Sequence, residues 1–219
     1  MFADVLIYLL ALTASTGGGW YLWRRVSMAS QILIVLLSLT LLSEFLTHIS
    51  GMPAAPRMVM YIIYTPLSFS MYVWIYHLLL RGNFNQRLTT FFFLVVLIAG
   101  IGAPLFVTSF VQFPSLGISI CSLVVVVCSL LLFAQMLQSP EDVALTQQPV
   151  FWLNTALLIY WTVFFFRHAL YDVMVTDSPE QTTLLDDIHL WLSVFYYATL
   201  GYSIKLDAGR RSPAAKHLQ

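Results

Sequence analysis

The chain has 219 residues, of which 59% are hydrophobic and 9% are charged, and its formal net charge at pH 7 is zero. An average soluble domain carries about a quarter charged residues, and much of any fold of this size stays in contact with solvent. The composition therefore excludes an ordinary soluble domain and predicts that lipid is the solvent for most of the chain. The balanced charge gives no indication of a nucleic-acid partner.

The hydrophobic residues form long blocks, whereas the strands of a membrane barrel show alternating segments of about ten residues. Because only helices and closed barrels satisfy their backbone hydrogen bonds inside hydrocarbon, long blocks predict helices. Each block has the roughly 20 residues that a bilayer core requires. The sequence predicts an all-α membrane protein, a seven-helix transmembrane bundle over residues 1–205, with spans at 4–23, 29–50, 58–80, 88–111, 116–137, 150–172 and 184–204.

In chain order, the first span is expected to be an uncleaved helix, because residues 1–4 lack the Lys and Arg of a secretory signal. Its three consecutive glycines, at 17–19, favour close packing against a neighbouring helix. No charged residue occurs between Arg87 and Glu141, a stretch too long for one crossing, so two spans are expected there. Pro114 predicts a turn at 112–115 between them, because proline ends helices. Pro66 and Pro104 fall inside predicted helices and are expected to kink them.

The distribution of Lys and Arg predicts the orientation of the spans. Cytoplasmic loops carry an excess of basic residues, so the N-terminus is expected outside and the C-terminus inside the inner (plasma) membrane. A short basic tail, residues 206–219, is expected to be disordered and to touch anionic headgroups. On this topology the outer loops carry Arg57 alone, and the inner loops and tail carry Arg24, Arg25, Arg81, Arg87, Lys205, Arg210, Arg211 and Lys216.

Ionisable residues inside spans are costly and are candidates for function. Glu44 and His48 are four residues apart on the second span and share a helix face. The third span carries a polar stripe, and the sixth and seventh spans carry further ionisable groups near the same, outer side. These residues are Tyr61, Tyr64, Thr65, Ser68 and Tyr72 on the third span, Arg167, His168, Tyr171 and Asp172 on the sixth, and Asp186, Asp187 and His189 on the seventh.

We expect these four spans to surround an outward-opening polar pocket, because lipid cannot satisfy their hydroxyl and charged groups. Three interpretations of the pocket are open. The first is structural: Glu44 pairs with Arg167 at a similar depth, which fixes helix packing because an unpaired charge there is costly. The second is a site for a small ligand or proton in a sensory, receptor-like protein, lined by Glu44, His48, Tyr61, Tyr64, Arg167, His168, Asp172 and His189.

The third interpretation is a metal site formed by His48, His168 and His189, which stand on three different spans. Three histidines and a water form a catalytic zinc geometry, and nearby carboxylates can act as a general base. Seven-helix membrane hydrolases of the ceramidase and progestin-receptor type use such a site, but the paired histidines of their last helix are missing here. If the pocket is the site of a sensory, receptor-like protein, which is the leading interpretation, we expect no resident cofactor. If it is a metal site, we expect zinc.

Two stretches of the chain together carry a resemblance to a known group of proteins. One runs from Glu44 through residues 61–69, with the sequence YIIYTPLSF, and the other comprises residues 149–154 and 158–161, with the sequences PVFWLN and LIYW. They resemble small, functionally uncharacterised seven-helix bacterial membrane proteins, related to modules that precede sensor histidine kinases. The resemblance implies a sensory context in which a signal passes to a cytoplasmic or membrane partner protein, because this chain has no kinase domain.

Overall fold

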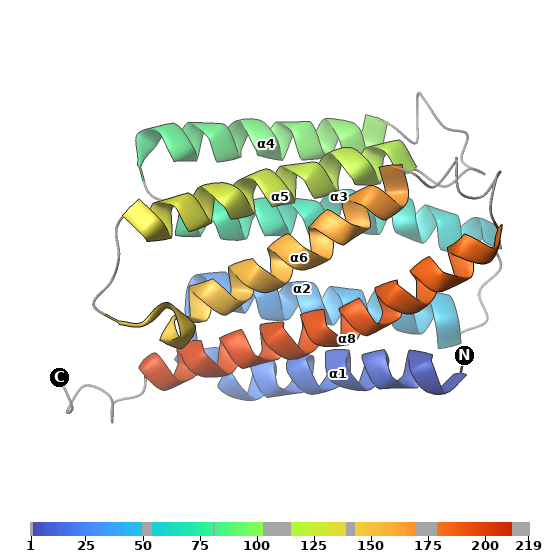
Figure 1. The fold of residues 1–219 in the computed structure, drawn as a ribbon, viewed down its shortest axis with the longest axis horizontal. Helices are drawn as coiled ribbons and strands as arrows, with labels where there is room; N and C mark the ends of the chain where they lie inside the picture. Colours follow the sequence, from blue (N-terminus) through green and yellow to red (C-terminus); the bar gives the residue numbers. More distant parts are fainter. Residues whose placement is uncertain are drawn as a thin grey trace.

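The computed structural model describes residues 2–49, 54–80, 82–102, 115–138, 143–169 and 179–211. Within these ranges the chain is all-helical, as predicted, and contains no strand (Figure 1). Short helical turns, η1 (Trp23–Arg25) and η4 (Leu145–Gln147), and a π-helical segment, η2 (Phe45–Ile49), adjoin the main helices. The main helices are α1 (Phe2–Leu22), α2 (Met28–Glu44), α3 (Ala54–Leu79), α4 (Asn83–Gly102), α5 (Ser115–Gln138), α6 (Pro149–Ala169) and α8 (Pro179–Arg210).

Each predicted span coincides with one of these helices, although several boundaries differ. The second span continues past α2 as η2, and α3 begins four residues before the predicted start of the third span. Pro66 lies inside α3, as predicted. Residues 103–114, which include Pro104 and most of the predicted turn between the fourth and fifth spans, lie outside the described residues.

Four helical stretches are long and apolar enough to cross a membrane: Met28–Thr47, Ile62–Leu79, Leu116–Gln138 and Pro149–Ala169. A shorter apolar stretch, Gln86–Gly102, belongs to α4, whose predicted span runs on into residues that the structure does not describe. Helix α8 carries acidic and basic residues near its ends. Glycine, serine and threonine interrupt the apolar sequence of α1. Membrane crossing by all seven helices remains a prediction.

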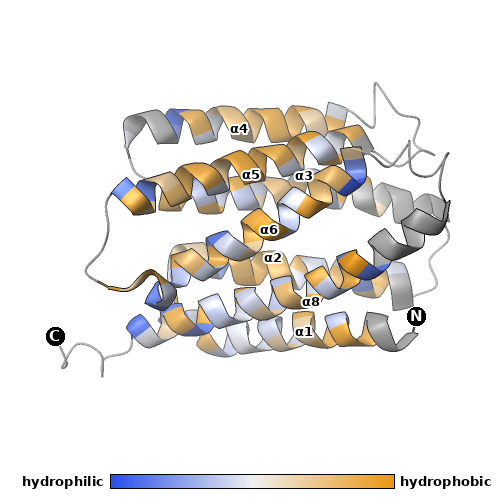
Figure 2. Ribbon diagram, in the orientation of Figure 1, coloured by the Kyte–Doolittle hydropathy of each residue, from blue (hydrophilic) through white to orange (hydrophobic). Residues whose placement is uncertain are grey.

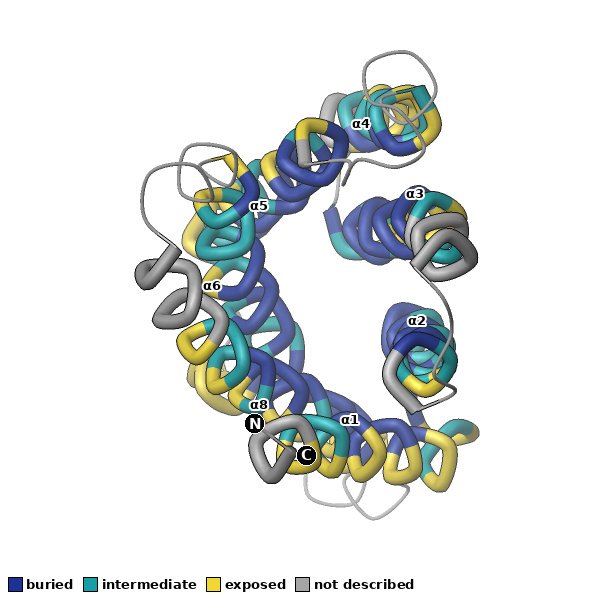
Figure 3. The backbone as a smooth tube through the Cα atoms, turned by 90° about the vertical axis from the view of Figure 1, so that its right-hand side faces the viewer, coloured by how far each residue is buried: buried dark blue, intermediate teal, exposed yellow. Residues whose placement is uncertain are grey.

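The helices form a ring in which each one packs against the next along the chain. Contacts run from α1 to α2, through α3, α4, α5 and α6 to α8, and α8 packs against α1 and closes the ring (Figure 3). Residues on the inner side of the ring are mostly buried, and the exposed residues lie mostly on its outer side. Many exposed residues are large and apolar, such as Ile98 on α4 and Leu130 on α5, which suits a surface in contact with lipid. Hydrophobic residues predominate along α4 and α5 (Figure 2).

Small residues allow two of these helix pairs to approach closely. A Cβ atom added to Gly201 of α8 would lie 2.6 Å from the Oγ of Ser15 on α1, and one added to Gly19 would lie 2.7 Å from Ile34 on α2. No heavy atom lies within 4 Å of such an atom at Gly17 or Gly18. Of the three consecutive glycines expected to favour close packing, Gly19 therefore makes the close approach.

The last helix extends further than the sequence predicted. Helix α8 continues to Arg210, although disorder was expected from residue 206. The carboxylate of Asp207 explains the difference, because its Oδ2 accepts a hydrogen bond from the backbone N–H of Ser27 and another from the hydroxyl of Ser30, both at 2.7 Å. Asp207 thereby satisfies donors at the N-terminus of α2 and ties the end of α8 to it.

Candidate ligand pocket

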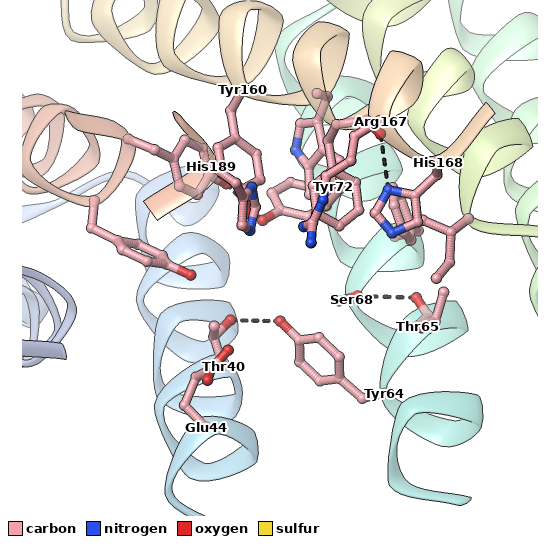
Figure 4. Close-up of a pocket in the computed structure, with 16 residues that line it drawn as sticks. Thr40, Glu44, Tyr64, Thr65, Ser68, Tyr72, Tyr160, Arg167, His168 and His189 are labelled. Atoms are coloured by element: carbon pink, nitrogen blue, oxygen red, sulfur yellow. Dashed lines mark hydrogen bonds between the residues drawn. The ribbon is translucent and has the colours of Figure 1, made fainter. Parts of the chain in front are cut away.

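A cavity of about 330 Å³ lies inside the ring, and residues of five helices line it (Figure 4). Such a volume is near the lower end of the roughly 300–1,000 Å³ that small-molecule sites occupy. Aromatic side chains make up half of the lining residues, and polar groups are distributed among them. The lining residues are Thr40 and Glu44 of α2, Tyr64, Thr65, Ser68, Phe69 and Tyr72 of α3, Ile118 of α5, Tyr160, Trp161, Phe164, Arg167 and His168 of α6, and His189, Tyr196 and Tyr197 of α8.

The α2 side of the pocket carries its acidic group. The Glu44 carboxylate accepts a hydrogen bond of 2.6 Å from the hydroxyl of Tyr8 on α1. The Tyr8 ring in turn stacks on Tyr197 of α8, with ring centroids 6.5 Å apart. One turn earlier on α2, the Thr40 hydroxyl shares a hydrogen bond of 2.7 Å with the hydroxyl of Tyr64 on α3. Helices α1, α3 and α8 thus hold the carboxylate side of the cavity in place.

The opposite side of the pocket carries the basic groups. Arg167 and His168 extend from the end of α6 and His189 from α8, and Figure 4 shows them across the cavity from Glu44. The Nδ1–H of His168 donates to the backbone carbonyl of Phe164 at 2.9 Å, which fixes the tautomer of a neutral ring. The Phe164 ring lies between the two imidazoles, with its centroid 4.1 Å from that of His168 and 5.3 Å from that of His189.

Aromatic rings join the two sides. The indole of Trp161 lies with its centroid 4.6 Å from Phe69 and 5.3 Å from Tyr72, both on α3. The hydroxyls of Tyr72 and Tyr196 share a hydrogen bond of 2.7 Å that links α3 to α8. Rings at these separations adopt the offset and edge-to-face arrangements that aromatic pairs prefer. They give the cavity a rigid, largely apolar surface.

Two polar atoms at this cavity are buried without a hydrogen-bond partner among the described residues. They are the Nε1 of Trp161 and the Nδ1 of His189. An unsatisfied buried donor or acceptor costs roughly 1–3 kcal/mol. Both atoms belong to residues that line the pocket, so a bound molecule could satisfy them.

The structure brings together five of the predicted ligand-binding residues around this cavity: Glu44, Tyr64, Arg167, His168 and His189. The predicted stripe on the third span also faces it through Thr65, Ser68 and Tyr72. The side chains of His48 and Tyr61, and the whole of Asp172, lie outside the described residues. A direct Glu44–Arg167 ion pair stays a prediction, and so does ligand binding itself.

The predicted metal site is only partly described. Two of its three histidines, His168 and His189, line one cavity, whereas the side chain of His48 is not described. Within the described part of the chain, no group of three or more His, Cys, Asp and Glu side chains could hold a metal ion. Because one ligand is missing from the described set, the three-histidine site also remains a prediction.

Sequence reasoning missed Tyr8, Trp161 and the tyrosines of α8. Tyr8 lies near the predicted outer end of the first span, at a depth similar to that of Glu44, and this matching depth was the only available signal. Trp161, Tyr196 and Tyr197 are apolar enough to pass for lipid-facing or packing residues. Only the order of the helices in the ring shows that they face the cavity.

No protein-family model, curated protein or solved structure matches the chain. Its class therefore follows from the fold and the site alone. It is an all-helical protein with several apolar helices compatible with a membrane, and it encloses an aromatic cavity with acidic and basic groups on facing sides.

Proposed function

We propose that this chain is a receptor-like integral membrane protein that binds a small ligand in the cavity between α2, α3, α6 and α8. In this proposal all seven helices cross the inner membrane. Ligand binding changes the packing of these helices, and the change passes to a cytoplasmic or membrane partner. The proposal extends the resemblance to sensory membrane modules, and it gives the polar groups inside the bundle a common role.

The proposed orientation places the N-terminus outside and the C-terminus inside. The described termini lie at opposite ends of the bundle (Figure 1), which suits an odd number of crossings. Arg24 and Arg25 follow α1, and Lys205 and Arg210 belong to the last turns of α8. These basic residues lie at the end of the bundle that the positive-inside rule assigns to the cytoplasm. The cavity then lies toward the external side, with Glu44 and Arg167 near the outer helix ends.

The observation that carries the proposal is the convergence of polar groups on one cavity from helices far apart in sequence. Polar side chains inside a membrane bundle are expensive to bury, so a packing role alone favours satisfying each of them within the protein. The indole N–H of Trp161 and the Nδ1 of His189 are instead left without partners among the described residues, and both belong to residues that line the cavity. A ligand that fills the cavity offsets this cost.

Thermal melting of the purified protein in the presence of a library of small metabolites tests this function. We expect at least one compound to raise the melting temperature of the native protein, because binding to the folded state stabilises it. The shift should be lost in Arg167→Ala and kept in Gln31→Ala, which alters a polar residue of α2 outside the cavity. A compound that stabilises the native protein and Arg167→Ala equally would refute the pocket.

A zinc-dependent membrane hydrolase is the second candidate, favoured by the presence of His168 and His189 on one cavity. Metal analysis of the purified protein distinguishes the hydrolase from the receptor-like protein. Near-stoichiometric zinc that is lost in His168→Ala would favour the hydrolase, and protein that contains no zinc after purification in zinc-supplemented medium would argue against it.

A further inference from the structure

Hydrogen-bond donors gather on one side of the cavity, and this limits the chemistry of the ligand. The indole N–H of Trp161 can only donate, and the guanidinium of Arg167 offers five N–H donors and no acceptor. Trp161 is 7% exposed, and its Nε1 has no partner among the described residues. A ligand that satisfies this atom must bring an acceptor to the α6 side of the cavity.

The same side of the cavity carries positive charge. Arginine carries a positive charge in proteins, and the planar guanidinium of Arg167 can hold a carboxylate through two parallel hydrogen bonds while other donors serve other contacts. The Nδ1 of His189 is buried there and donates in one of its tautomers. The carboxylate of Glu44 lies across the cavity (Figure 4) and is held by the Tyr8 hydroxyl. An anionic group is therefore favoured beside α6 and disfavoured beside α2.

The rest of the surface suits a flat apolar body. The ring of Trp161 lies 4.6 Å from Phe69, 5.3 Å from Tyr72 and 5.1 Å from Phe164, measured between centroids. A further aromatic ring packs favourably against such a surface, because offset and edge-to-face contacts add to the burial of apolar area. The volume of about 330 Å³ restricts the ligand to a small molecule.

We propose that the ligand is a small aromatic carboxylate. Its carboxylate accepts hydrogen bonds from Trp161 and Arg167, and its ring lies against Phe69, Tyr72 and Phe164. This inference rests on the proposed ligand-binding function and names the class of molecule that the same cavity takes.

The test is a binding series with the full-length protein in phosphatidylcholine nanodiscs, followed by calorimetry. The probes are phenylacetate, the neutral phenylacetamide, the cationic phenethylamine, and octanoate, which carries the same carboxylate without a ring. We expect saturable binding of phenylacetate. Phenylacetamide should bind at least about tenfold more weakly, because it loses the charged hydrogen bond. Octanoate should bind at least about tenfold more weakly, because it loses the aromatic contact.

Variants then test the two donors. Trp161→Phe keeps an aromatic ring and removes the N–H, so the Kd for phenylacetate should rise about tenfold, and Arg167→Gln should raise it about 10- to 100-fold. The matched control is Trp191→Phe on α8, where the side chain is 59% exposed on the outer surface, and it should leave the Kd unchanged. The four probes tested on the native protein decide whether the ligand is an aromatic carboxylate, even if a variant fails to fold.

Three outcomes would overturn the inference. Binding of octanoate as tight as that of phenylacetate would show that a fatty acid from the bilayer, not an aromatic acid, is the source of the carboxylate. If phenethylamine bound more tightly than phenylacetate, and Glu44→Gln abolished this binding, the ligand would be a cation and not an anion. The proposed receptor function would still stand. Saturable binding by none of the four probes would exclude aromatic carboxylates, while the metabolite melting screen would still decide the receptor function separately.

Discussion

Closure of the helix ring depends on the contact between Gly201 of α8 and Ser15 of α1, and replacing Gly201 with alanine tests it. The added Cβ would lie 2.6 Å from the Oγ of Ser15 and 3.1 Å from its Cβ. The Ser15 hydroxyl would have to move away, because Cβ atoms do not approach other atoms this closely, and the Ser15 Cβ would also have to give by a few tenths of an ångström. The movement also threatens the hydrogen bond of 2.8 Å that the Ser15 hydroxyl donates to the backbone carbonyl of Tyr197.

The expected magnitude follows from these contacts. Overpacking costs about 1–3 kcal/mol, and the loss of one hydrogen bond adds about 1 kcal/mol. The higher helix propensity of alanine offsets about 0.5–1 kcal/mol of this loss of stability. Gly201→Ala should therefore lower the free energy of unfolding by about 1–3 kcal/mol, measured by reversible denaturation in detergent.

Two further variants make the test specific. Gly18→Ala is the matched control, because no heavy atom lies within 4 Å of its added Cβ, and it should leave stability unchanged or slightly raised. Adding Ser15→Gly to Gly201→Ala transfers the side-chain volume from one helix to the other and should restore much of the loss. If Gly201→Ala were as stable as Gly18→Ala, the close packing of α1 on α8 would be wrong.

Three other variants test the polar contacts that hold the bundle. Asp207→Asn should lower the free energy of unfolding by about 1 kcal/mol, because the charge that caps the N-terminus of α2 is lost; an unchanged denaturation midpoint would contradict the cap. Asn154→Leu should cost about 1–3 kcal/mol, since the buried Tyr76 hydroxyl loses one of its two partners and the backbone carbonyl of Ser129 loses its amide donor, and the double variant with Tyr76→Phe should lose less than the sum of the two single losses in the same assay. Glu44→Gln and Arg167→Gln should each destabilise the fold and couple by about 0.5 kcal/mol or more in a double-mutant cycle, whereas simple additivity would argue against their pairing.

The helices could be predicted because a helix that crosses a bilayer requires about 20 apolar residues, and the sequence contains such blocks. Each block coincides with one helix, although the predicted seventh span, 184–204, is shorter than α8 by five residues at its start and six at its end. Glu44, Arg167 and His189 could be selected because charged and imidazole side chains are rare inside apolar blocks and costly there. Composition and spacing carry this information directly.

The end of α8 and the aromatic wall of the cavity could not be predicted, because both depend on contacts between distant parts of the chain. Lys205 and Arg210 indicate a solvated tail, and only the bonds of Asp207 to Ser27 and Ser30 show that the helix continues there. Trp161 has no local signal that distinguishes a cavity wall from a lipid-facing surface. Its position follows from the closed order of the helices, which the sequence does not encode in any local pattern.

The accessibility of a thiol placed in the cavity tests the central claim most directly. Ser68 lines the cavity and Ser203 lies elsewhere in the bundle, and the two side chains are equally buried, at 3% and 2% exposure. We would replace each with cysteine in a chain whose native, buried Cys121 and Cys128 are alanine, and treat intact cells with a small membrane-impermeant thiol reagent. The account predicts labelling of Ser68→Cys from outside and none of Ser203→Cys; equal labelling of both, or labelling of Ser68→Cys only in inside-out vesicles, would contradict it.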